Sequence, residues 1–349
     1  MNEHNGKAAG SPIAILALTR GGRELTARLA PLLQAEVIDP GPQGLAQTLA
    51  QVWPHHAGLV LIMAAGVAVR AIAPLLNDKR TDPGVVVLDE AGRFAVSLLA
   101  GHLGGANDLA RQVATLTGGQ AVITTASDTL GLTALDLWAR HHDLILVQGN
   151  LTTASATLVN NGTIKVFTDL LGDLPPDFMM VTDPAQAELI ISNRLPTAGS
   201  SQTILCPRNL AMGIGCNRGT TAAQIEAAAK ETCQRNGLQF QAVSRLASID
   251  LKEDEQGLLQ FAAAHGLDLL WYNADLLNSV PGITLSPAAQ KATGAQAVAD
   301  PAALLAAGCH TLLIRKTKWK DVTIALAEIP FRLTAGYRSS APDPVAPST

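Results

Sequence analysis

The first third of the chain alternates short, fully apolar runs with longer stretches in which apolar residues recur at helical spacing. Apolar runs of strand length occur at 13–18, 59–63, 85–88, 94–99 and 121–124. Helical patterns occur at 23–33, 67–76 and 106–116. Continuous apolar strands that alternate with helices are typical of a mostly parallel sheet covered on both faces. We therefore predict an N-terminal α/β domain over residues 1–145.

The same alternation returns in the last third of the chain and predicts a C-terminal α/β domain over 207–335. Helical patterns occur at 220–235, 253–265 and 301–307. Strand-like runs occur at 211–213, 267–271, 311–314 and 322–327. Residues 146–206 contain four prolines and the short β-like runs 165–168 and 188–192, which indicates a small middle domain. Residues 1–11 and the Ser/Pro-rich tail 336–349 are predicted to be disordered.

Composition and charge narrow the class of protein further. The chain is 48% hydrophobic but only 3% aromatic, so Ala, Leu and Val must do most of the packing, which favours α/β over a β-sandwich. A net charge of −4 provides no general field for nucleic acid. The first ten residues lack the apolar stretch of a signal peptide, and the longest apolar run, 58–69, is too short to span a bilayer. We expect a cytoplasmic protein without membrane or nucleic-acid partners.

The cysteines and histidines do not have the spacing of a metal site. Cys206, Cys216, Cys233 and Cys309 form no CxxC pair, so we expect reduced thiols and no structural zinc. The tandem histidines at 55–56 and 141–142 are predicted to lie at the surface, because adjacent residues on a helix face different ways.

The run GHLGGAN at 101–107 is the strongest candidate for chemistry. It lies between an apolar strand and a helical pattern, where a helix N-terminus leaves backbone N–H groups unpaired. Glycines such as Gly104 and Gly105 let an anion approach those groups. His102 beside them can move a proton near neutral pH. The alternative is a tight turn, which needs one glycine rather than three.

Other polar residues follow the predicted strands, where ligands bind in open α/β sheets. They are Arg70, Lys79, Asp89, Thr124, Thr125 and Asp128. Taken singly, Arg70, Lys79 and Asp89 are better explained as parts of a solvated rim. Asp128 could orient a histidine or accept a proton, or it could cap the following segment.

A second glycine loop, GIGCNRG at 213–219, opens the C-terminal domain. Its spacing is GxGxxxG rather than GxGxxG, and no acidic residue clearly ends a strand about 20 residues later, which disfavours a dinucleotide site. An anion-binding loop with Arg218 at the helix start and a tight structural turn both remain open.

Several of these stretches resemble one known family. They are GVAVRAIAPLL at 66–76, SLLAGHLGGAN at 97–107, VITTASD at 122–128, GIGCNRG at 213–219 and SIDLK at 248–252, with the closing runs 312–316 and 322–327. Together they resemble the CbiG family, the cobalt-precorrin-5A hydrolases of anaerobic cobalamin (vitamin B12) biosynthesis. The chain departs from the family pattern at Asp300, where Glu is expected, and after Ser286, where an acidic residue is expected.

The resemblance implies a reaction on a cobalt-bearing corrinoid, a modified tetrapyrrole. Water opens a ring-A δ-lactone, and a two-carbon unit then leaves as acetaldehyde, giving cobalt-precorrin-5B. The cobalt arrives with the substrate, so no cofactor and no protein metal site are expected. His102 is the candidate base, backbone N–H groups at 104–107 are candidate oxyanion donors, and Asp128 or Asp89 is the base for the second step.

The substrate carries many acetate and propionate groups, which basic and polar side chains can bind. Candidate substrate-binding residues are Arg70, Lys79, Gly104, Gly105, Asn107, Thr124, Thr125, Gly215, Asn217, Arg218 and Lys316. Two other functions remain open, a non-catalytic corrinoid carrier and a nucleotide- or sugar-phosphate-binding enzyme. Contacts with other enzymes of the pathway and the oligomeric state, a homodimer included, also remain open.

Overall fold

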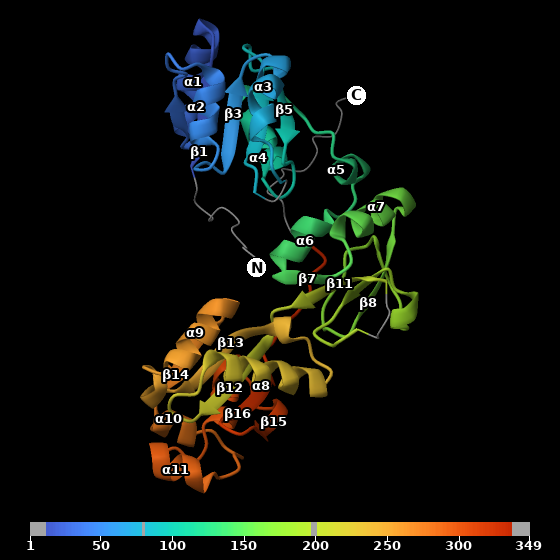
Figure 1. Ribbon diagram of the computed structural model, residues 1–349. Helices are drawn as coiled ribbons and strands as arrows, with labels where there is room; N and C mark the ends of the chain where they lie inside the picture. Colours follow the sequence, from blue (N-terminus) through green and yellow to red (C-terminus); the bar gives the residue numbers. More distant parts are fainter. Residues whose placement is uncertain (1–11, 79–80, 197–200, 337–349) are drawn as a thin grey trace. The chain divides into compact units, whose positions relative to one another are not determined.

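The computed structural model describes residues 12–78, 81–196 and 201–336, and the described residues form three β-sheets (Figure 1). The chain divides into two compact units. Among the described residues, unit 1 contains residues 12–138 and Gly336, and unit 2 covers Ala139–Ala335. Predicted disorder at 1–11 and after Gly336 lies outside the described residues.

Unit 1 contains one six-stranded sheet in the order β2-β1-β3-β4-β5-β6. Its strands are β1 (Ile13–Ala17), β2 (Glu36–Ile38), β3 (Gly58–Ile62), β4 (Gly84–Leu88), β5 (Phe94–Leu99) and β6 (Gln120–Val122). All neighbours pair in parallel except β4 and β5, which are antiparallel. The reversal places the carboxyl ends of β5 and β6 at the opposite edge of the sheet from those of β1, β3 and β4.

Helices cover both faces of this sheet, as the apolar strands predict. The helices that cover it are α1 (Arg20–Leu33), α2 (Leu45–Val52), α3 (Ala65–Ile72) and α4 (Ala106–Thr117). Helices α5 (Ala126–Leu130) and α6 (Leu135–His141) follow β6, and α6 crosses the limit between the two units after Trp138. Leu29 of α1 and Val113 of α4 pack in one cluster with Val60 of β3. Leu49 of α2 and Ile72 of α3 pack on the other face with neighbouring strand residues. The alternation of β3 side chains between two cores explains why every position of that strand is buried.

Unit 2 contains two five-stranded sheets. The first has the order β7-β11-β10-β8-β9, from β7 (Leu144–Gln148), β8 (Ile164–Thr168), β9 (Phe178–Met180), β10 (Leu189–Ile191) and β11 (Thr203–Pro207), with helix α7 (Leu151–Asn161). The second has the order β14-β13-β12-β16-β15, from β12 (Leu210–Cys216), β13 (Val243–Ile249), β14 (Asp268–Tyr272), β15 (Leu312–Lys318) and β16 (Val322–Glu328).

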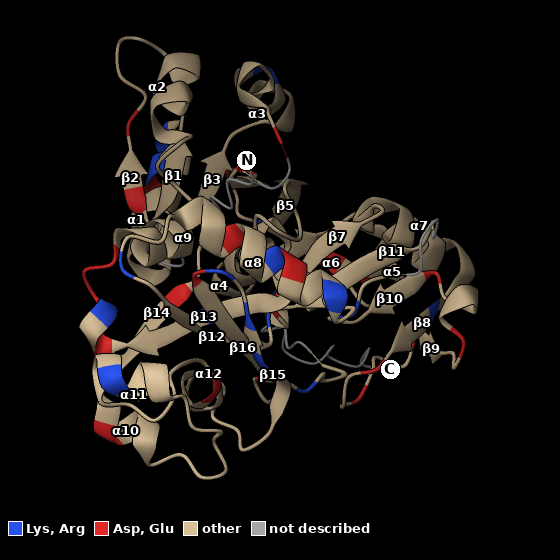
Figure 2. Cartoon of the chain, turned by 60° about the horizontal axis from the view of Figure 1, so that its bottom comes forward, with Lys and Arg blue, Asp and Glu red and all other residues tan. Residues whose placement is uncertain are grey.

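Helices also enclose the second sheet of unit 2. They are α8 (Ala222–Arg235), α9 (Gln256–His265), α10 (Ala274–Asn278), α11 (Pro287–Thr293) and α12 (Ala299–Ala307). Helices α8 and α9 pack on one face of the sheet, and the Ala-rich α12 packs on the other. Figure 2 shows charged residues of both signs along α8, where Lys230–Glu226 and Arg235–Glu231 form pairs one helical turn apart.

A buried polar bridge joins the two sheets of unit 2. Asn193 Nδ2 donates to Asn209 Oδ1 at 3.1 Å, and the Nδ2 groups of both residues donate to Glu328 Oε1 at 3.2 and 2.9 Å. Both asparagines are almost fully buried, so loss of either amide would leave a polar partner unsatisfied. The residues predicted as a middle domain are therefore fixed to the C-terminal sheet.

Several sequence predictions need adjustment. The predicted limit between residues 145 and 146 falls inside β7, which belongs to the first sheet of unit 2. The helix predicted at 67–76 is α3 followed by a 3₁₀ turn at Ala73–Leu75, because Pro74 cannot continue the helix. His56 and His142 are buried, contrary to the surface prediction, and His56 Nδ1 lies 2.9 Å from the Val52 carbonyl oxygen. The four cysteines are not paired with one another in the structure. Over the described residues, the helices are too short or too polar to cross a membrane.

Candidate active site

The GHLGGAN loop joins β5 to α4 and closes on itself through its own backbone. The N–H of Gly105 donates to the His102 carbonyl at 2.9 Å, and the N–H of Asn107 donates to the Gly101 carbonyl at 3.0 Å. The Ala106 N–H donates to the Ala100 carbonyl at 3.3 Å. Three of the four amides predicted as oxyanion donors, those of residues 105–107, therefore already donate to carbonyl groups of the loop.

Close backbone packing explains the glycines of the loop. A Cβ atom at Gly84 in β4 would lie 2.3 Å from the Gly104 carbonyl oxygen, and one at Gly104 would lie 2.5 Å from the Ala100 Cβ. Gly105 has φ +76°, and Ala100, which carries a side chain, has φ +53°. The loop is thus held against the first residue of β4 in a conformation that only small residues allow.

A larger residue at position 84 should therefore displace the loop that carries His102. We expect Gly84→Ala to lower the free energy of unfolding by about 1–3 kcal/mol, because the added methyl group meets backbone that cannot yield cheaply. The loop that carries His102 should shift with it, and activity should fall by about 10-fold or more. Gly58→Ala is the matched control on the paired strand, since its closest new contact is the end of a flexible side chain, Leu109 Cδ2, at 3.1 Å. Equal melting temperatures and activities for the two variants would contradict this packing account.

His102 lies between two carboxylates, and both of its ring nitrogens are engaged. Nε2 lies 2.9 Å from Asp128 Oδ2, and Nδ1 lies 3.2 Å from Asp136 Oδ1. Ser127 Oγ lies 3.3 Å from the same Nε2. The imidazole side chain is 16% exposed, so the ring is mostly buried but still in contact with solvent. Asp128 and Ser127 come from α5 and Asp136 from α6, which the chain forms directly after β6.

These contacts favour the charged form of the ring. Hydrogen bonds to Asp128 and Asp136 raise the pKa of His102 to about 9, against the opposing effect of burial. The pKa of Asp128 is lowered, mainly by the hydrogen bond from His102. Burial would raise the pKa of Asp136, but the hydrogen bond from His102 and its charge leave that pKa below its usual value. At pH 7 the cluster holds an imidazolium between two ionised carboxylates.

A second set of side chains fixes Asp128. Asn107 Nδ2 donates to Asp128 Oδ2 and to Thr125 Oγ1, both at 3.0 Å, and Arg111 forms an ion pair with Asp128 Oδ1. Asn107 is itself held by the Ser97 hydroxyl, which donates to its Oδ1 at 2.7 Å. Asp128 therefore keeps charged and neutral donors besides His102.

The structure brings together only some of the side chains that the sequence predicted for a site in unit 1. His102, Asn107, Thr125 and Asp128 come together, and Thr124 is exposed beside them in sequence. Asp89 follows β4 at the opposite edge of the sheet. The length of that strand, at about 3.3 Å per residue, separates Asp89 from the His102 edge by about 17 Å. Its Oδ1 accepts from the Phe94 N–H at 2.7 Å and closes the β4–β5 turn. The predicted catalytic role of Asp89 beside His102 does not fit this placement. Arg70 is exposed on α3, and Lys79 lies outside the described residues.

In the glycine loop of unit 2, a carboxylate of the same unit already accepts a hydrogen bond from a loop amide. The Gly219 N–H donates to Glu255 Oε1 at 2.8 Å, and Lys252 Nζ lies 3.4 Å from Glu255 Oε2. Arg218 pairs with Asp254, and Asn217 Nδ2 donates to Asp321 Oδ1 at 3.1 Å. Of the two alternatives for this loop, a structural turn explains these contacts.

The other unit 2 residues predicted to bind substrate also make contacts within the unit. Lys316 Nζ donates to the Thr284 carbonyl at 3.1 Å, and Gly215 faces Thr323 on the neighbouring strand. Asp300, the departure from the family pattern, is buried and accepts from the Lys316 backbone N–H at 2.8 Å. The substrate-binding roles of Gly215, Asn217, Arg218 and Lys316 stay predictions.

Sequence reasoning assigned no role to three members of the His102 cluster, which are Arg111, Ser127 and Asp136. Arg111 lies four residues after Asn107, so helical spacing on α4 could have indicated it. Asp136 lies 34 residues after His102 in sequence, and no spacing rule connects the two.

Among the described residues, no group of three or more His, Cys, Asp or Glu side chains has the geometry to hold a metal ion. Burial raises the pKa of the Cys206 and Cys233 thiols to about 12, so both stay protonated at neutral pH.

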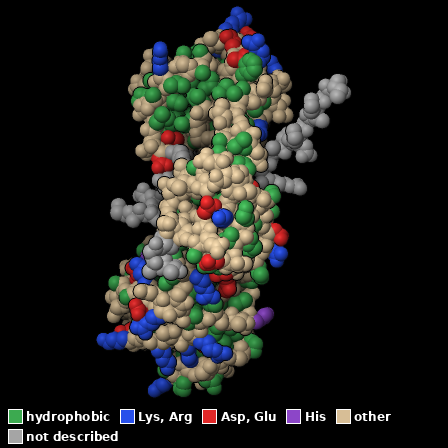
Figure 3. All heavy atoms as spheres, turned by 90° about the vertical axis from the view of Figure 1, so that its right-hand side faces the viewer, with side chains coloured by type: hydrophobic (Ala, Val, Ile, Leu, Met, Phe, Trp, Pro, Cys, Tyr) green, Lys and Arg blue, Asp and Glu red, His purple; other side chains and the backbone are tan. Residues whose placement is uncertain are grey.

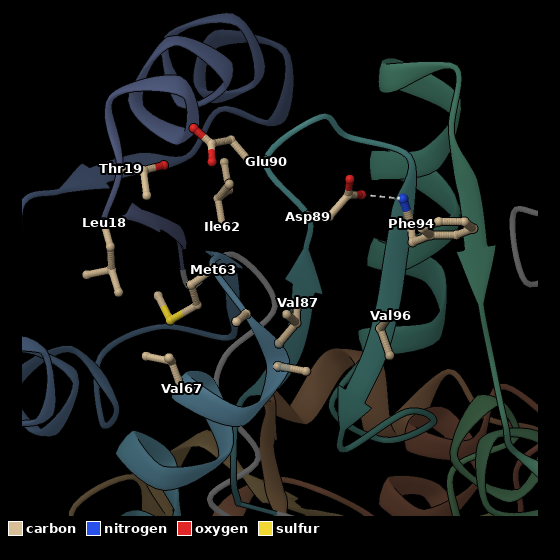
Figure 4. Close-up of a pocket in the computed structure, with 12 residues that line it drawn as sticks. Leu18, Thr19, Ile62, Met63, Val67, Val87, Asp89, Glu90, Phe94 and Val96 are labelled. Atoms are coloured by element: carbon tan, nitrogen blue, oxygen red, sulfur yellow. Dashed lines mark hydrogen bonds between the residues drawn. The ribbon is translucent and has the colours of Figure 1, made fainter.

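An apolar hollow of about 510 Å³ lies at the other edge of the unit 1 sheet (Figure 4). Leu18, Met63, Val67 and Phe94 line it, with Asp89 and neighbouring residues at the rim. Figure 3 shows hydrophobic side chains gathered over unit 1 on the face it presents. The lining residues include no Lys or Arg, so the hollow lacks the positive side chains that bind phosphates or carboxylates.

The fold and the site define a multi-domain α/β protein with an acid–base cluster at the end of one sheet. Family models match both ends of the chain, "Cobalamin synthesis G N-terminal" at residues 47–128 and "Cobalamin synthesis G C-terminus" at 210–327. The chain belongs to this CbiG family. The first match ends at Asp128 and contains His102.

Two curated relatives are similar to this chain over about nine tenths of its length, and a third over less than half. The "Cobalt-precorrin-5A hydrolase" of Priestia megaterium is 33% identical, covering 91% of this chain and 95% of the relative. The protein of the same name from Salmonella typhimurium is also 33% identical, covering 90% of this chain and 97% of the relative. "Protein CobE" from Sinorhizobium sp. is 30% identical over 42% of this chain and 96% of its own length.

Proposed function

We propose that this chain is a cobalt-precorrin-5A hydrolase that acts in cobalamin biosynthesis. Two curated relatives with this name match almost the whole chain at 33% identity, and both family models of the CbiG family match it. The geometric observation that supports hydrolysis here is the His102 imidazole held between Asp128 and Asp136. The substrate is a small-molecule corrinoid, and we place the reaction in the cytoplasm.

The proposed reaction has two stages. Water is added across the ring-A δ-lactone, which gives a free acetate and a hydroxyl group. A base then removes the hydroxyl proton, a carbon–carbon bond breaks, and acetaldehyde leaves while the electron pair passes into the macrocycle. The cobalt ion belongs to the substrate, and the proposal assigns the protein no cofactor of its own.

His102 is the proposed proton carrier for lactone opening. Asp136 accepts from Nδ1–H, which fixes the tautomer and leaves Nε2 to take a proton. When Nε2 becomes protonated, the two carboxylates stabilise the imidazolium, which can then return the proton to the departing ring oxygen. A positioned base of this kind contributes about 10²–10⁴-fold to a rate. Asp128 and Asp136 remain the candidates for the second deprotonation at the same place.

The test is acetaldehyde release from cobalt-precorrin-5A by the purified full chain under anaerobic conditions. The proposal expects one acetaldehyde for each macrocycle consumed, and a product macrocycle that has gained one water and lost one acetaldehyde. Tight binding of the corrinoid without acetaldehyde would overturn the proposal in favour of a carrier. A large rise in melting temperature with NAD or ATP, and none with the corrinoid, would favour a nucleotide-binding enzyme.

A further inference from the structure

Ser127 lies beside His102 but has no role in the reaction proposed above. It is the second residue of α5, and 7% of its surface is exposed. Its Oγ lies 3.3 Å from His102 Nε2, while Asp136 Oδ1 lies 3.2 Å from Nδ1 on the other side of the ring. A hydroxyl, an imidazole and a carboxylate in this order form the arrangement that activates a serine for attack on an acyl carbon.

We propose that Ser127 is the nucleophile that opens the lactone, through a covalent acyl-enzyme. This inference rests on the proposed function and adds a catalytic residue to it. The substrate class that it requires is a cyclic ester whose carbonyl carbon can reach Oγ.

The steps balance without a further reactant. The Ser127 hydroxyl gives its proton to His102 Nε2 while Oγ bonds to the lactone carbonyl carbon. The ring carbon–oxygen bond breaks, and the departing oxygen takes the proton from Nε2. Water then attacks the Ser127 ester, its proton passes to Nε2 and on to Oγ, and the macrocycle leaves with a free acetate.

Asp128 shares Nε2 with Ser127, and the two neighbours suit different states of the ring. The charged ring has an N–H at Nε2, which Asp128 accepts at 2.9 Å. The neutral ring has a lone pair there, to which only the Ser127 hydroxyl can donate. Asn107 and Arg111 keep donating to Asp128 when the ring loses its proton, so this carboxylate is not left unpaired.

The other hydroxyl groups of this segment are directed elsewhere. Thr125 Oγ1 accepts from Asn107 Nδ2, and Thr129 Oγ1 donates to the Ala126 carbonyl at 2.9 Å. Ser127 is thus the hydroxyl of α5 that lies against the imidazole.

The experiment combines rapid acid quenching with mass measurement of the intact chain during a single turnover of cobalt-precorrin-5A. The parent chain should carry a covalent adduct of the macrocycle, which peptide fragmentation places on Ser127. Ser127→Ala should form no adduct and should lose at least about 100-fold in acetaldehyde release. Thr129→Ala is the matched control, because it removes a hydroxyl from the same helix that does not face His102; it should behave like the parent.

The outcomes separate this inference from the proposed function. If the parent releases acetaldehyde and Ser127→Ala does so at a similar rate, water attacks directly and the inference is overturned while the function stands. If the parent releases none, the function itself is wrong. Melting temperatures show whether Ser127→Ala folds; if it does not, Ser127→Cys, which can form a thioester, should give an adduct at the same position, and its absence overturns the inference.

Discussion

Replacing His102 with glutamine should reduce acetaldehyde release by about 10²–10⁴-fold, equivalent to about 3–5 kcal/mol in the barrier. Glutamine can still hydrogen-bond to one neighbouring carboxylate, but it cannot take up a proton. The loss should therefore appear in kcat, with little change in the affinity for the macrocycle. Single-turnover acetaldehyde release and corrinoid binding, measured on the same preparation, check both parts.

His55→Gln is the matched control for this variant. His55 is exposed in the same unit and lies outside the His102 cluster, so its replacement should leave the rate unchanged. A parental rate for His102→Gln, with His55→Gln also unchanged, would remove His102 from the reaction.

Replacing Asp136 with asparagine should have the second largest effect, a loss on the order of 100-fold or more in kcat. The amide group can donate to Nδ1 as well as accept from it, which allows the tautomer with the proton on Nε2. That tautomer cannot accept a proton from Ser127 or water. The loss of a negative neighbour should also lower the pKa of His102, so the remaining activity should extend to lower pH than in the parent.

Asp39→Asn provides the comparison, because Asp39 is exposed and pairs with Arg23 on the surface of the same unit. It should leave both the rate and the pH profile unchanged. If Asp136→Asn changed thermal stability alone and kept the parental profile, its role would be structural rather than the positioning of His102.

The central strands β3 and β4 were predictable because they are apolar throughout, whereas β13, with Ser244 and Arg245 among its residues, was not predicted. The run predicted at 59–63 corresponds to β3, and that at 85–88 to β4, with limits within one residue. The direction of β5 was not predictable, since an apolar run has the same pattern whichever way the strand lies. This reversal decides which polar residues meet, because it separates Asp89 from His102.

The candidate site was predictable only where its members follow one another along the chain. His102 and Asp128 each follow a strand, and β5 and β6 end at the same edge. Asp136 reaches His102 because of where α6 lies, and no local sequence pattern predicts the position of that helix. The glycines were correctly singled out but for another reason, since Gly104 allows contact with Gly84. In unit 2, the Gly219 N–H donates to Glu255, which lies 36 residues further along the chain. The sequence of the loop alone could not show that this amide already has a hydrogen-bond partner.

The pH dependence of kcat/KM for acetaldehyde release tests the role of His102 most directly. The base must be neutral to accept a proton, and with a pKa of about 9 only about 1% of the rings are neutral at pH 7. We predict that kcat/KM rises about tenfold per pH unit from pH 6 to 8 and levels off above about pH 9, and that the residual rate of His102→Gln lacks this rise. A profile that stays flat from pH 6 to 10, or falls above pH 8, would contradict proton uptake by His102.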